Sequence, residues 1–315
     1  MFSLSDYHGI FPPTVTPLDA DERVDQASVR SLVNYVLDNG VHGIWVMGTT
    51  AEFPALNTAQ REAAIGATID AVAGRVPIIA NISDGGTRMA IEHARIAQRL
   101  GADAISATPT YYFNHTQDEM LAHYRAIREA VDLPLFVYNF PQMVKLRLEV
   151  STVVTLAAEG TVAGIKDSQN DLQWFRALMT ATREREIEFR GFLGTRTLID
   201  AGMVVGAHGA VPSVSNIAPR LVVDMYEAAA RGDFARAGEL QDIIIRYDNL
   251  STAVVGGSLN ASSIGMLKAV LVARGIIANG RTTLPLRPFR SEEIAAIGER
   301  LADLPAADRM PVHTS

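Results

Sequence analysis

Lys166 is the residue whose surroundings most clearly indicate chemistry. It ends a short apolar run, residues 162–166, and the polar stretch 167–170 follows at once. A run of that length between polar residues is typical of a buried strand, with the lysine at its carboxyl end. Burial disfavours an ammonium and lowers its pKa, so a neutral amine able to form a Schiff base with a carbonyl is available near pH 7. The alternative for Lys166 alone is a side chain that reaches solvent or pairs with Asp167.

The sequence alternates short apolar runs with amphipathic segments, and this pattern indicates the elements that would position Lys166. Eight runs are predicted as strands: residues 9–15, 43–47, 76–80, 104–107, 135–138, 162–166, 189–193 and 209–211. Between them, apolar side chains recur at helical spacing, for example in residues 27–37, 59–72 and 90–100. Asn57, Thr116 and Ser151 are predicted to start helices, and Gly40 and Gly101 to follow them.

The predicted fold is a (β/α)8 TIM barrel with a C-terminal helical extension. Eight strand–helix units imply a parallel sheet, and eight in one chain of this size favour a closed barrel. An open doubly wound sheet is disfavoured because no Gly-x-Gly-x-x-Gly turn follows the first strand. After residue 211 only helices are predicted, over residues 216–231, 234–252, 262–273 and 291–301. We therefore predict a catalytic barrel over residues 1–231, a helical extension over 232–304 and a loose tail over 305–315.

The composition argues against several classes of protein. The chain has 315 residues, a formal net charge of −7 and no lysine or arginine cluster of the kind that binds nucleic acid. It contains no cysteine, which excludes disulfides, thiol catalysis and cysteine-ligated metal sites and is compatible with the cytoplasm. We expect no secretory signal, and no apolar run approaches the ~20 residues of a membrane span. A cytoplasmic protein without nucleic-acid or membrane partners is predicted.

Other polar residues follow the predicted strands. Groups at the carboxyl ends of barrel strands converge on one face, where barrel active sites lie. Gly48-Thr49-Thr50 follows the second strand, Tyr111 and Tyr112 follow the fourth, and Tyr138 ends the fifth. A Gly-Thr-Thr turn offers N–H and hydroxyl donors to a carboxylate, and a phenol near the lysine can shuttle a proton. The structural alternatives are a helix entry, a packed aromatic at Tyr138, and turn or subunit contacts at the other two tyrosines.

Together these motifs resemble one known family. The set Gly48-Thr49-Thr50-x-Glu52, Tyr112, Tyr138-Asn139-x-Pro141 and Gly164-Ile165-Lys166, in this order and spacing, resembles the dihydrodipicolinate synthase/N-acetylneuraminate lyase family. The resemblance covers nearly the whole chain, as far as residues 284–288. It implies a class I aldolase or lyase that forms a Schiff base with pyruvate and acts on an aldehyde or 2-oxo acid. It implies no metal and no organic cofactor, because the iminium is itself the electron sink.

The resemblance also implies roles for the matching residues. Lys166 would condense with the pyruvate ketone, and Tyr138 would be the acid/base at the reacting centre. Thr49 and Tyr112 would extend the proton relay, and in the family this second tyrosine often comes from a neighbouring subunit. The pyruvate carboxylate would be held by a substrate-binding group that comprises Thr50 and the backbone at Gly48, with the backbone near Val211 lining the same site. By resemblance alone, the chain is expected to be a homo-oligomer, a dimer or tetramer.

Some positions depart from the synthase pattern. Met143 stands where the synthases carry an arginine that grips the second carboxylate of the substrate, and a thioether cannot replace that bidentate clamp. Arg196 follows the seventh strand, where acidic residues are usual; it either faces the cavity and binds a distal carboxylate or caps its helix. Ala51 replaces a glycine, which is tolerable only if the backbone is not left-handed. His208 is either a ligand-side group or a packed histidine.

The predicted function is a pyruvate-dependent aldolase or lyase that makes or breaks a C–C bond between pyruvate and an aldehyde. The expected substrate is a 2-keto-3-deoxy sugar acid or a related 2-oxo acid. One alternative is dihydrodipicolinate synthase, which uses aspartate semialdehyde and which Met143 disfavours; another is a sugar-acid dehydratase that uses the same lysine. An alternative of a different class is a catalytically silent binding protein. The complete set of Lys166, Tyr138 and Thr49 disfavours it.

Overall fold

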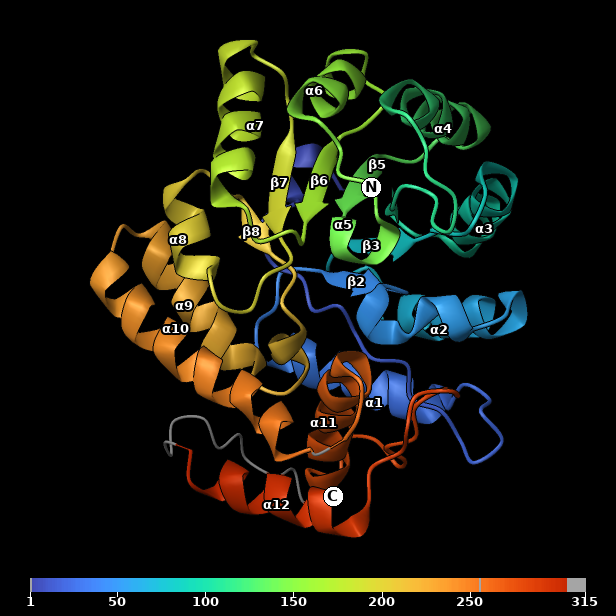
Figure 1. Ribbon diagram of the computed structural model, residues 1–315. Coiled ribbons are helices and arrows are strands. Elements are labelled where there is room, and N and C mark those ends of the chain that lie inside the picture. The colour runs from blue at the N-terminus through green and yellow to red at the C-terminus, as the bar shows by residue number, and fades with distance from the viewer. Residues whose placement is uncertain (1, 255, 305–315) are drawn as a thin grey trace.

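The computed structural model describes residues 2–254 and 256–304 (Figure 1). Its eight strands pair in parallel in the order β1-β8-β7-β6-β5-β4-β3-β2. They are β1 (Gly9–Ile10), β2 (Ile44–Val46), β3 (Ile78–Asn81), β4 (Ala104–Ala107), β5 (Leu135–Asn139), β6 (Gly164–Asp167), β7 (Arg190–Leu193) and β8 (Gly209–Ala210). Each observed strand lies within a predicted one, except that some extend one residue further at the carboxyl end.

The two edge strands approach each other, which curls the sheet into a TIM-barrel-like fold. The N–H of His42 donates to the Ile10 carbonyl (2.9 Å) and that of Trp45 donates to the Pro12 carbonyl (3.0 Å). Pro13 and Trp45 also form an isolated parallel bridge. β1 is shorter than predicted because Pro12 and Pro13 have no N–H to donate to a ladder.

Helices surround the sheet and continue beyond it (Figure 1). The helices that alternate with the strands are α1 (Gln26–Asp38), α2 (Thr58–Val72), α3 (Thr87–Leu100), α4 (Gln117–Ala130), α5 (Pro141–Val144), α6 (Val150–Ala158), α7 (Leu172–Glu184), α8 (Ile199–Val204) and α9 (Pro219–Ala230). Three more follow without strands between them: α10 (Phe234–Asp248), α11 (Leu259–Ala273) and α12 (Ser291–Ala302). In the described part of the chain, no helix is long and apolar enough to cross a membrane.

Short 3-10 helices complete the architecture. They are η1 (Leu4–Asp6), η2 (Thr49–Ala51), η3 (Phe53–Ala55), η4 (Ser213–Asn216) and η5 (Asn249–Ala253). Two of them, η2 and η3, follow β2 directly and are separated by Glu52 alone. They take the place of a helix entry after Gly48, so the Gly-Thr-Thr segment forms a tight turn instead of the first turn of α2.

Most of the predicted helix boundaries are confirmed. Asn57 and Thr116 are the N-caps of α2 and α4, each in a reciprocal capping box with the residue three positions on. Gly40 and Gly101 adopt left-handed backbone (φ 82° and 96°) after α1 and α3. The predicted start at Ser151 is wrong, because α6 already begins at Val150 with Glu149 as its N-cap.

An aromatic cluster separate from the main core packs on the strands. It consists of Tyr7, Phe11, Trp45, Ile79, Ala104, Phe136, Phe192 and Val211. The ring of Trp45 lies edge-on to those of Phe136 and Phe192, with centroids 6.1 and 6.3 Å apart. Gly164 leaves room for this cluster, since a Cβ there would lie 2.3 Å from the Arg190 carbonyl oxygen and 2.5 Å from the Phe136 ring. The glycine two residues before Lys166 is therefore a packing requirement.

Candidate active site

Lys166 is buried beside Tyr138. The two residues are register partners on β6 and β5, and Lys166 is only 3% exposed. Its Nζ lies 4.1 Å from the centroid of the Tyr138 ring and 5.3 Å from that of Trp45. Among the described residues no carboxylate pairs with it, and the Asp167 carboxylate instead accepts a hydrogen bond from Asn139 (2.7 Å). The alternative of a solvent-exposed or Asp167-paired lysine is therefore wrong.

The burial of Lys166 has an electrostatic consequence. Desolvation lowers the pKa of its ammonium from 10.5 to about 7, and no other cause contributes. A substantial share of the Lys166 amines is thus neutral near pH 7. The rings of Tyr138 and Trp45 stabilise the charged ammonium form, but less than a carboxylate partner would. The site presents an amine that is nucleophilic without an external base.

Two hydroxyl groups, those of Thr49 and Ser168, approach the Tyr138 phenol. The Thr49 hydroxyl lies 3.0 Å from the Tyr138 hydroxyl, and Ser168 also hydrogen-bonds the phenol. Burial raises the pKa of Tyr138 to about 12, while these two hydrogen bonds act in the opposite direction. The phenol is therefore protonated near neutral pH and can give a proton to, or pass one from, a group bound at Lys166. Thr49, Tyr138 and Lys166, predicted at the ends of separate strands, therefore lie close together as expected.

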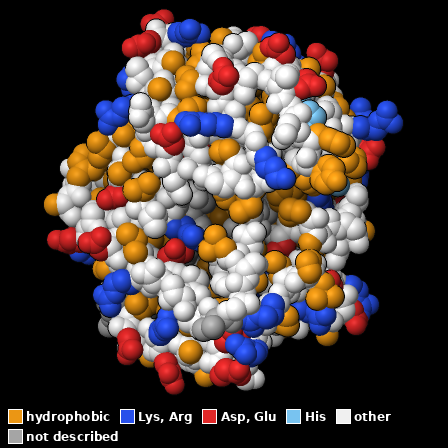
Figure 2. All heavy atoms as spheres, viewed as in Figure 1, with side chains coloured by type: hydrophobic (Ala, Val, Ile, Leu, Met, Phe, Trp, Pro, Cys, Tyr) orange, Lys and Arg blue, Asp and Glu red, His pale blue; other side chains and the backbone are white. Residues whose placement is uncertain are grey.

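One cavity collects most of the predicted site residues. It has a volume of about 310 Å³, and we call it the central cavity. Its lining includes seven of the predicted residues: Thr49, Thr50, Tyr138, Met143, Lys166, Arg196 and Val211. Gly48 lies directly beside it, because a Cβ on this residue would come 3.9 Å from the Lys166 Nζ. In the space-filling view, Figure 2 shows a hollow near the middle of the molecule.

Tyr112 lies outside the central cavity of its own chain. Its side chain is 83% exposed, and it forms an edge-to-face pair with the exposed Phe113, with ring centroids 5.2 Å apart. The preceding Tyr111 instead packs against Phe53 and lines a second cavity of about 430 Å³, which we call the side cavity. The relay role of Tyr112 stays a prediction that requires a neighbouring subunit.

Arg196 lines the central cavity, but its guanidinium is already engaged. Its Nε lies 3.0 Å from a carboxylate oxygen of Asp248 on α10, and its Nη1 donates to the Ser263 hydroxyl on α11 (2.9 Å). A distal substrate carboxylate would have to compete with Asp248. Among the described lining residues, Lys166 and Arg196 are the only cations, so apart from Lys166 this lining presents no unpaired positive charge.

Ala51 and Gly194 fit the site for different reasons, one of backbone conformation and one of space. Ala51 belongs to η2 and does not have a positive φ; the neighbouring left-handed positions are Met47 (φ 61°) and Glu52 (φ 66°). The requirement predicted for Ala51 is thus met. Gly194 borders the lysine itself, since a Cβ there would lie 1.9 Å from the Ser168 hydroxyl and 3.1 Å from the Lys166 Cε.

His208 is a packed histidine. It precedes β8, at the end of the strand away from the central cavity, and its Nδ1 accepts a hydrogen bond from the Gly191 N–H (3.1 Å). Burial lowers the pKa of this histidine to about 4, which keeps its imidazole neutral and able to accept that bond. Of the two possibilities for this residue, the structure supports the structural one.

Several residues of the central cavity are not among the site residues predicted from the sequence. Ser168 lies two positions after Lys166, and alternation along an extended segment would have placed both side chains on one side. Asn260, Ser263 and Ile264 come from α11, in the segment predicted as a mere extension. No local pattern signals them, because only the folded chain brings α11 over the strands.

Comparison with known proteins agrees with this geometry. The dihydrodipicolinate synthetase family matches residues 6–303. The chain belongs to this family. An uncharacterized DapA-like lyase from Halobacterium salinarum is 36% identical over 297 residues, covering 94% of each chain. A 4-hydroxy-tetrahydrodipicolinate synthase from Acidobacterium capsulatum is 34% identical over 299 residues, covering 94% of this chain and 95% of the relative.

Solved structures of the dihydrodipicolinate synthetase family share the fold. YagE from Escherichia coli K12, solved in complex with pyruvate, has a TM-score of 0.88 at 25% identity and covers 95% of this chain and 98% of its own. Dihydrodipicolinate synthase from Bacteroides thetaiotaomicron has a TM-score of 0.89 at 31% identity, with coverages of 94% and 98%. The chain is accordingly a family enzyme of the lyase class.

Proposed function

We propose that this chain is a Schiff-base-forming, pyruvate-dependent aldolase or lyase. The observation that carries the proposal is Lys166: a buried amine without an ion-pair partner in the described structure, with its pKa lowered to about 7, facing a cavity beside a phenol. A structural lysine would be paired or exposed. The likeness to a family member that was solved with pyruvate supports the same chemistry.

The proposed reaction begins with attack of the neutral Lys166 Nζ on the ketone carbon of pyruvate. The ketone oxygen leaves as water, and a protonated imine remains. Loss of a proton from the adjacent methyl group gives an enamine, whose carbon attacks an aldehyde carbonyl, and the aldehyde oxygen takes up a proton to become a hydroxyl. Water then releases the product from Lys166. The cleavage reaction runs through the same steps in reverse.

Other residues of the central cavity have proposed roles in this sequence. Tyr138 gives and takes the protons at the reacting centre, and Thr49 connects its phenol to the next relay group through their 3.0 Å contact. Thr50 and the backbone at Gly48 hold the pyruvate carboxylate, and Val211 lines the same cavity. Tyr112 completes the relay from a second copy of the chain, within a dimer or tetramer.

We propose an uncharged, hydroxylated aldehyde as the acceptor, so that the product is a 2-keto-3-deoxy sugar acid or related 2-oxo acid. Met143 supplies no charge to the central cavity, and the guanidinium of Arg196 is neutralised by Asp248. The names of the relatives favour the alternative, dihydrodipicolinate synthesis from aspartate semialdehyde. The described residues that line the central cavity include no free cation, besides the Schiff-base lysine, for the second carboxylate of that substrate. A dehydratase that uses the same lysine is a further alternative.

A comparison of aldehydes tests this choice. With pyruvate as donor, we expect kcat/KM for glyceraldehyde to exceed that for aspartate semialdehyde by about 10-fold or more, since a buried carboxylate without a partner is costly. Steady-state rates with both aldehydes, at equal pyruvate, give this ratio. A ratio in favour of aspartate semialdehyde would support the synthase, and water loss from a sugar acid without pyruvate release would support the dehydratase.

The lowered pKa of Lys166 predicts a pH dependence. Only the neutral amine reacts, so acylation of Lys166 should rise as pH rises through about 7 and level off above it. Labelling with an amine-reactive ester between pH 5 and 9, followed by peptide mass analysis, measures the midpoint, with the exposed Lys145 as the reference peptide. A Lys166 midpoint near the ordinary value of 10.5 would contradict the proposed activation.

The remaining predictions concern organisation. A catalytic barrel over residues 1–231 and an extension over 232–304 stay a proposed division, and α11 shows that the second part contributes to the cavity of the first. The predicted loose tail, residues 305–315, lies outside the described residues. The dimeric or tetrameric state and the cytoplasmic location stay predictions; one similar solved structure is titled a monomeric dihydrodipicolinate synthase variant.

A further inference from the structure

Glu52 and Lys268 form a fully buried ion pair, and Glu52 lines the side cavity. The Lys268 side chain is 0% exposed and the Glu52 side chain 1%, and their charged atoms lie 2.6 Å apart. Lys268 also donates to the Arg281 carbonyl (2.7 Å). The second carboxylate oxygen of Glu52 accepts from the N–H and the hydroxyl of Thr283, at 2.6 and 2.7 Å. The proposed reaction uses neither residue of the pair.

The pair joins two walls of the central cavity. Glu52 directly follows η2, which carries Thr49 and Thr50, and it holds a left-handed backbone (φ 66°) that costs a non-glycine residue free energy. Lys268 lies on α11, one turn after Ile264 and on the same face, and Ile264 lines the central cavity. Fixing Glu52 to Lys268 therefore fixes the threonine turn relative to α11.

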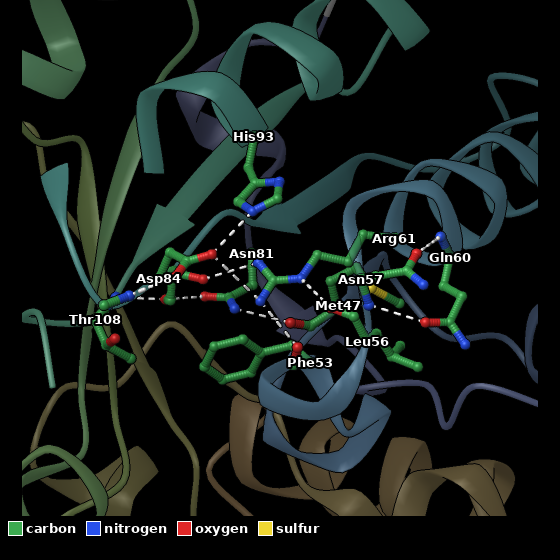
Figure 3. Close-up of polar contacts among 12 residues, drawn as sticks. Met47, Phe53, Leu56, Asn57, Gln60, Arg61, Asn81, Asp84, His93 and Thr108 are labelled. Atoms are coloured by element: carbon green, nitrogen blue, oxygen red, sulfur yellow. Dashed lines mark hydrogen bonds and ion pairs between the residues drawn. The ribbon is translucent and has the colours of Figure 1, made fainter. Parts of the chain in front are cut away.

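A separate set of contacts holds the chain on the far side of Glu52 (Figure 3). The buried Arg61 donates to the carbonyls of Phe53 (2.9 Å), Leu56 (3.2 Å) and Ser83 (3.0 Å), and its charge faces Asp84 at 3.7 Å. These contacts do not involve Lys268. Loss of the Glu52–Lys268 pair should thus leave η3 anchored and loosen the turn that precedes Glu52, where, in the described structure, only the bond from the Thr16 hydroxyl to the Ala51 carbonyl (3.0 Å) ties its end to another part of the chain.

We propose that Glu52 and Lys268 are positioning residues that hold the Thr49 hydroxyl against the Tyr138 phenol, so that the C-terminal helices set the geometry of the proton relay. The role of this relay rests on the proposed function. A contact of 3.0 Å between two hydroxyls is sensitive to small displacements of the turn, and misplacement of a catalytic group by about 1 Å can cost 10²-fold in rate.

The test needs only pyruvate. Exchange of the pyruvate methyl protons for deuterium in D2O, followed by proton NMR, reports proton removal at the enzyme-bound imine without any aldehyde. Lys268→Met should lower this exchange rate by about 10- to 100-fold, whereas borohydride trapping of pyruvate on Lys166 stays near the wild-type extent. Unchanged exchange in a variant with a lowered melting temperature would overturn the proposal, because the pair would then be merely structural.

A double-mutant cycle shows whether the pair acts through Thr49. In the Thr49→Val background the relay contact is already lost, so Lys268→Met should cost less than about 3-fold more. An equal loss in both backgrounds would overturn the proposed route. If Lys268→Met does not fold, because Glu52 is left buried and unpaired, Glu52→Gln/Lys268→Met removes both charges and enters the same cycle.

Two controls separate the possible failures. Glu293→Gln breaks another ion pair of the C-terminal segment, Arg287–Glu293 (2.8 Å), whose residues line neither cavity, and it should leave exchange unchanged. Wild-type protein that forms no pyruvate adduct would refute the proposed function itself. Wild-type protein that forms the adduct, with variants that exchange as fast as wild type, would refute the positioning role alone.

Discussion

Lys166→Ala is expected to remove the pyruvate adduct and to lower aldol turnover by about 10⁴-fold or more. The variant lacks the nucleophile on which every covalent step depends, and loss of a catalytic nucleophile commonly has effects of this size or larger. Intact mass after borohydride reduction with pyruvate, and initial rates with the preferred aldehyde, measure the two effects. Wild-type turnover in this variant would remove the proposed mechanism.

A companion variant, Lys166→Met, shows that such losses are not caused by unfolding. The folded-state pKa of Lys166 is about 7 against 10.5 for a free lysine, so below pH 7 the fold bears the full cost of the depressed pKa, which fades as pH rises toward 10.5. An apolar side chain avoids that cost. We expect Lys166→Met to be more stable than wild type by about 1–4 kcal/mol at pH 6, and by less at pH 9. Chemical denaturation at both pH values measures this difference.

Tyr138→Phe is expected to lower turnover by about 10²–10⁴-fold while pyruvate trapping on Lys166 remains. The change removes the proton-transfer hydroxyl but keeps the ring, which contacts Phe140 and Trp45. Turnover with the preferred aldehyde and methyl-proton exchange of pyruvate both report the loss.

Tyr124→Phe is a matched control for that variant. Tyr124 is also fully buried and its hydroxyl donates to the Ala107 carbonyl (3.0 Å), but it does not line the central cavity. This change should affect stability only, by about 0.5–1.5 kcal/mol for one hydrogen bond. Equal activity losses in the two variants, or none in Tyr138→Phe, would assign the acid/base role to another group.

Local patterns were sufficient to predict the strands and the meeting of Tyr138 with Lys166. Each strand is a short apolar run, and parallel strands place their carboxyl ends at one edge, so residues at those positions converge. These inferences need only the spacing of apolar residues along the sequence and the geometry of parallel strands. The condition set for Ala51, a backbone that is not left-handed, is met, but the left-handed backbone of Met47 and Glu52 close by could not be predicted from those residue types.

Long-range contacts could not be predicted in this way. Glu52 and Lys268 are 216 positions apart, and nothing near either residue indicates the other. The pairing of Arg196 with Asp248 likewise depends on how α10 packs, so the sequence left its orientation open. Tyr112 is a different case, because its predicted role depends on a second chain.

The most direct test of the proposed chemistry is borohydride reduction of the wild-type protein with pyruvate, followed by intact mass and peptide mapping. We predict one pyruvate-derived adduct per chain, located on Lys166, whose amine is neutral near pH 7. Lys268, which is equally buried but paired with Glu52, should stay unmodified. A folded protein without an adduct, or with the adduct on another lysine, would contradict the assignment of Lys166 as the Schiff-base residue.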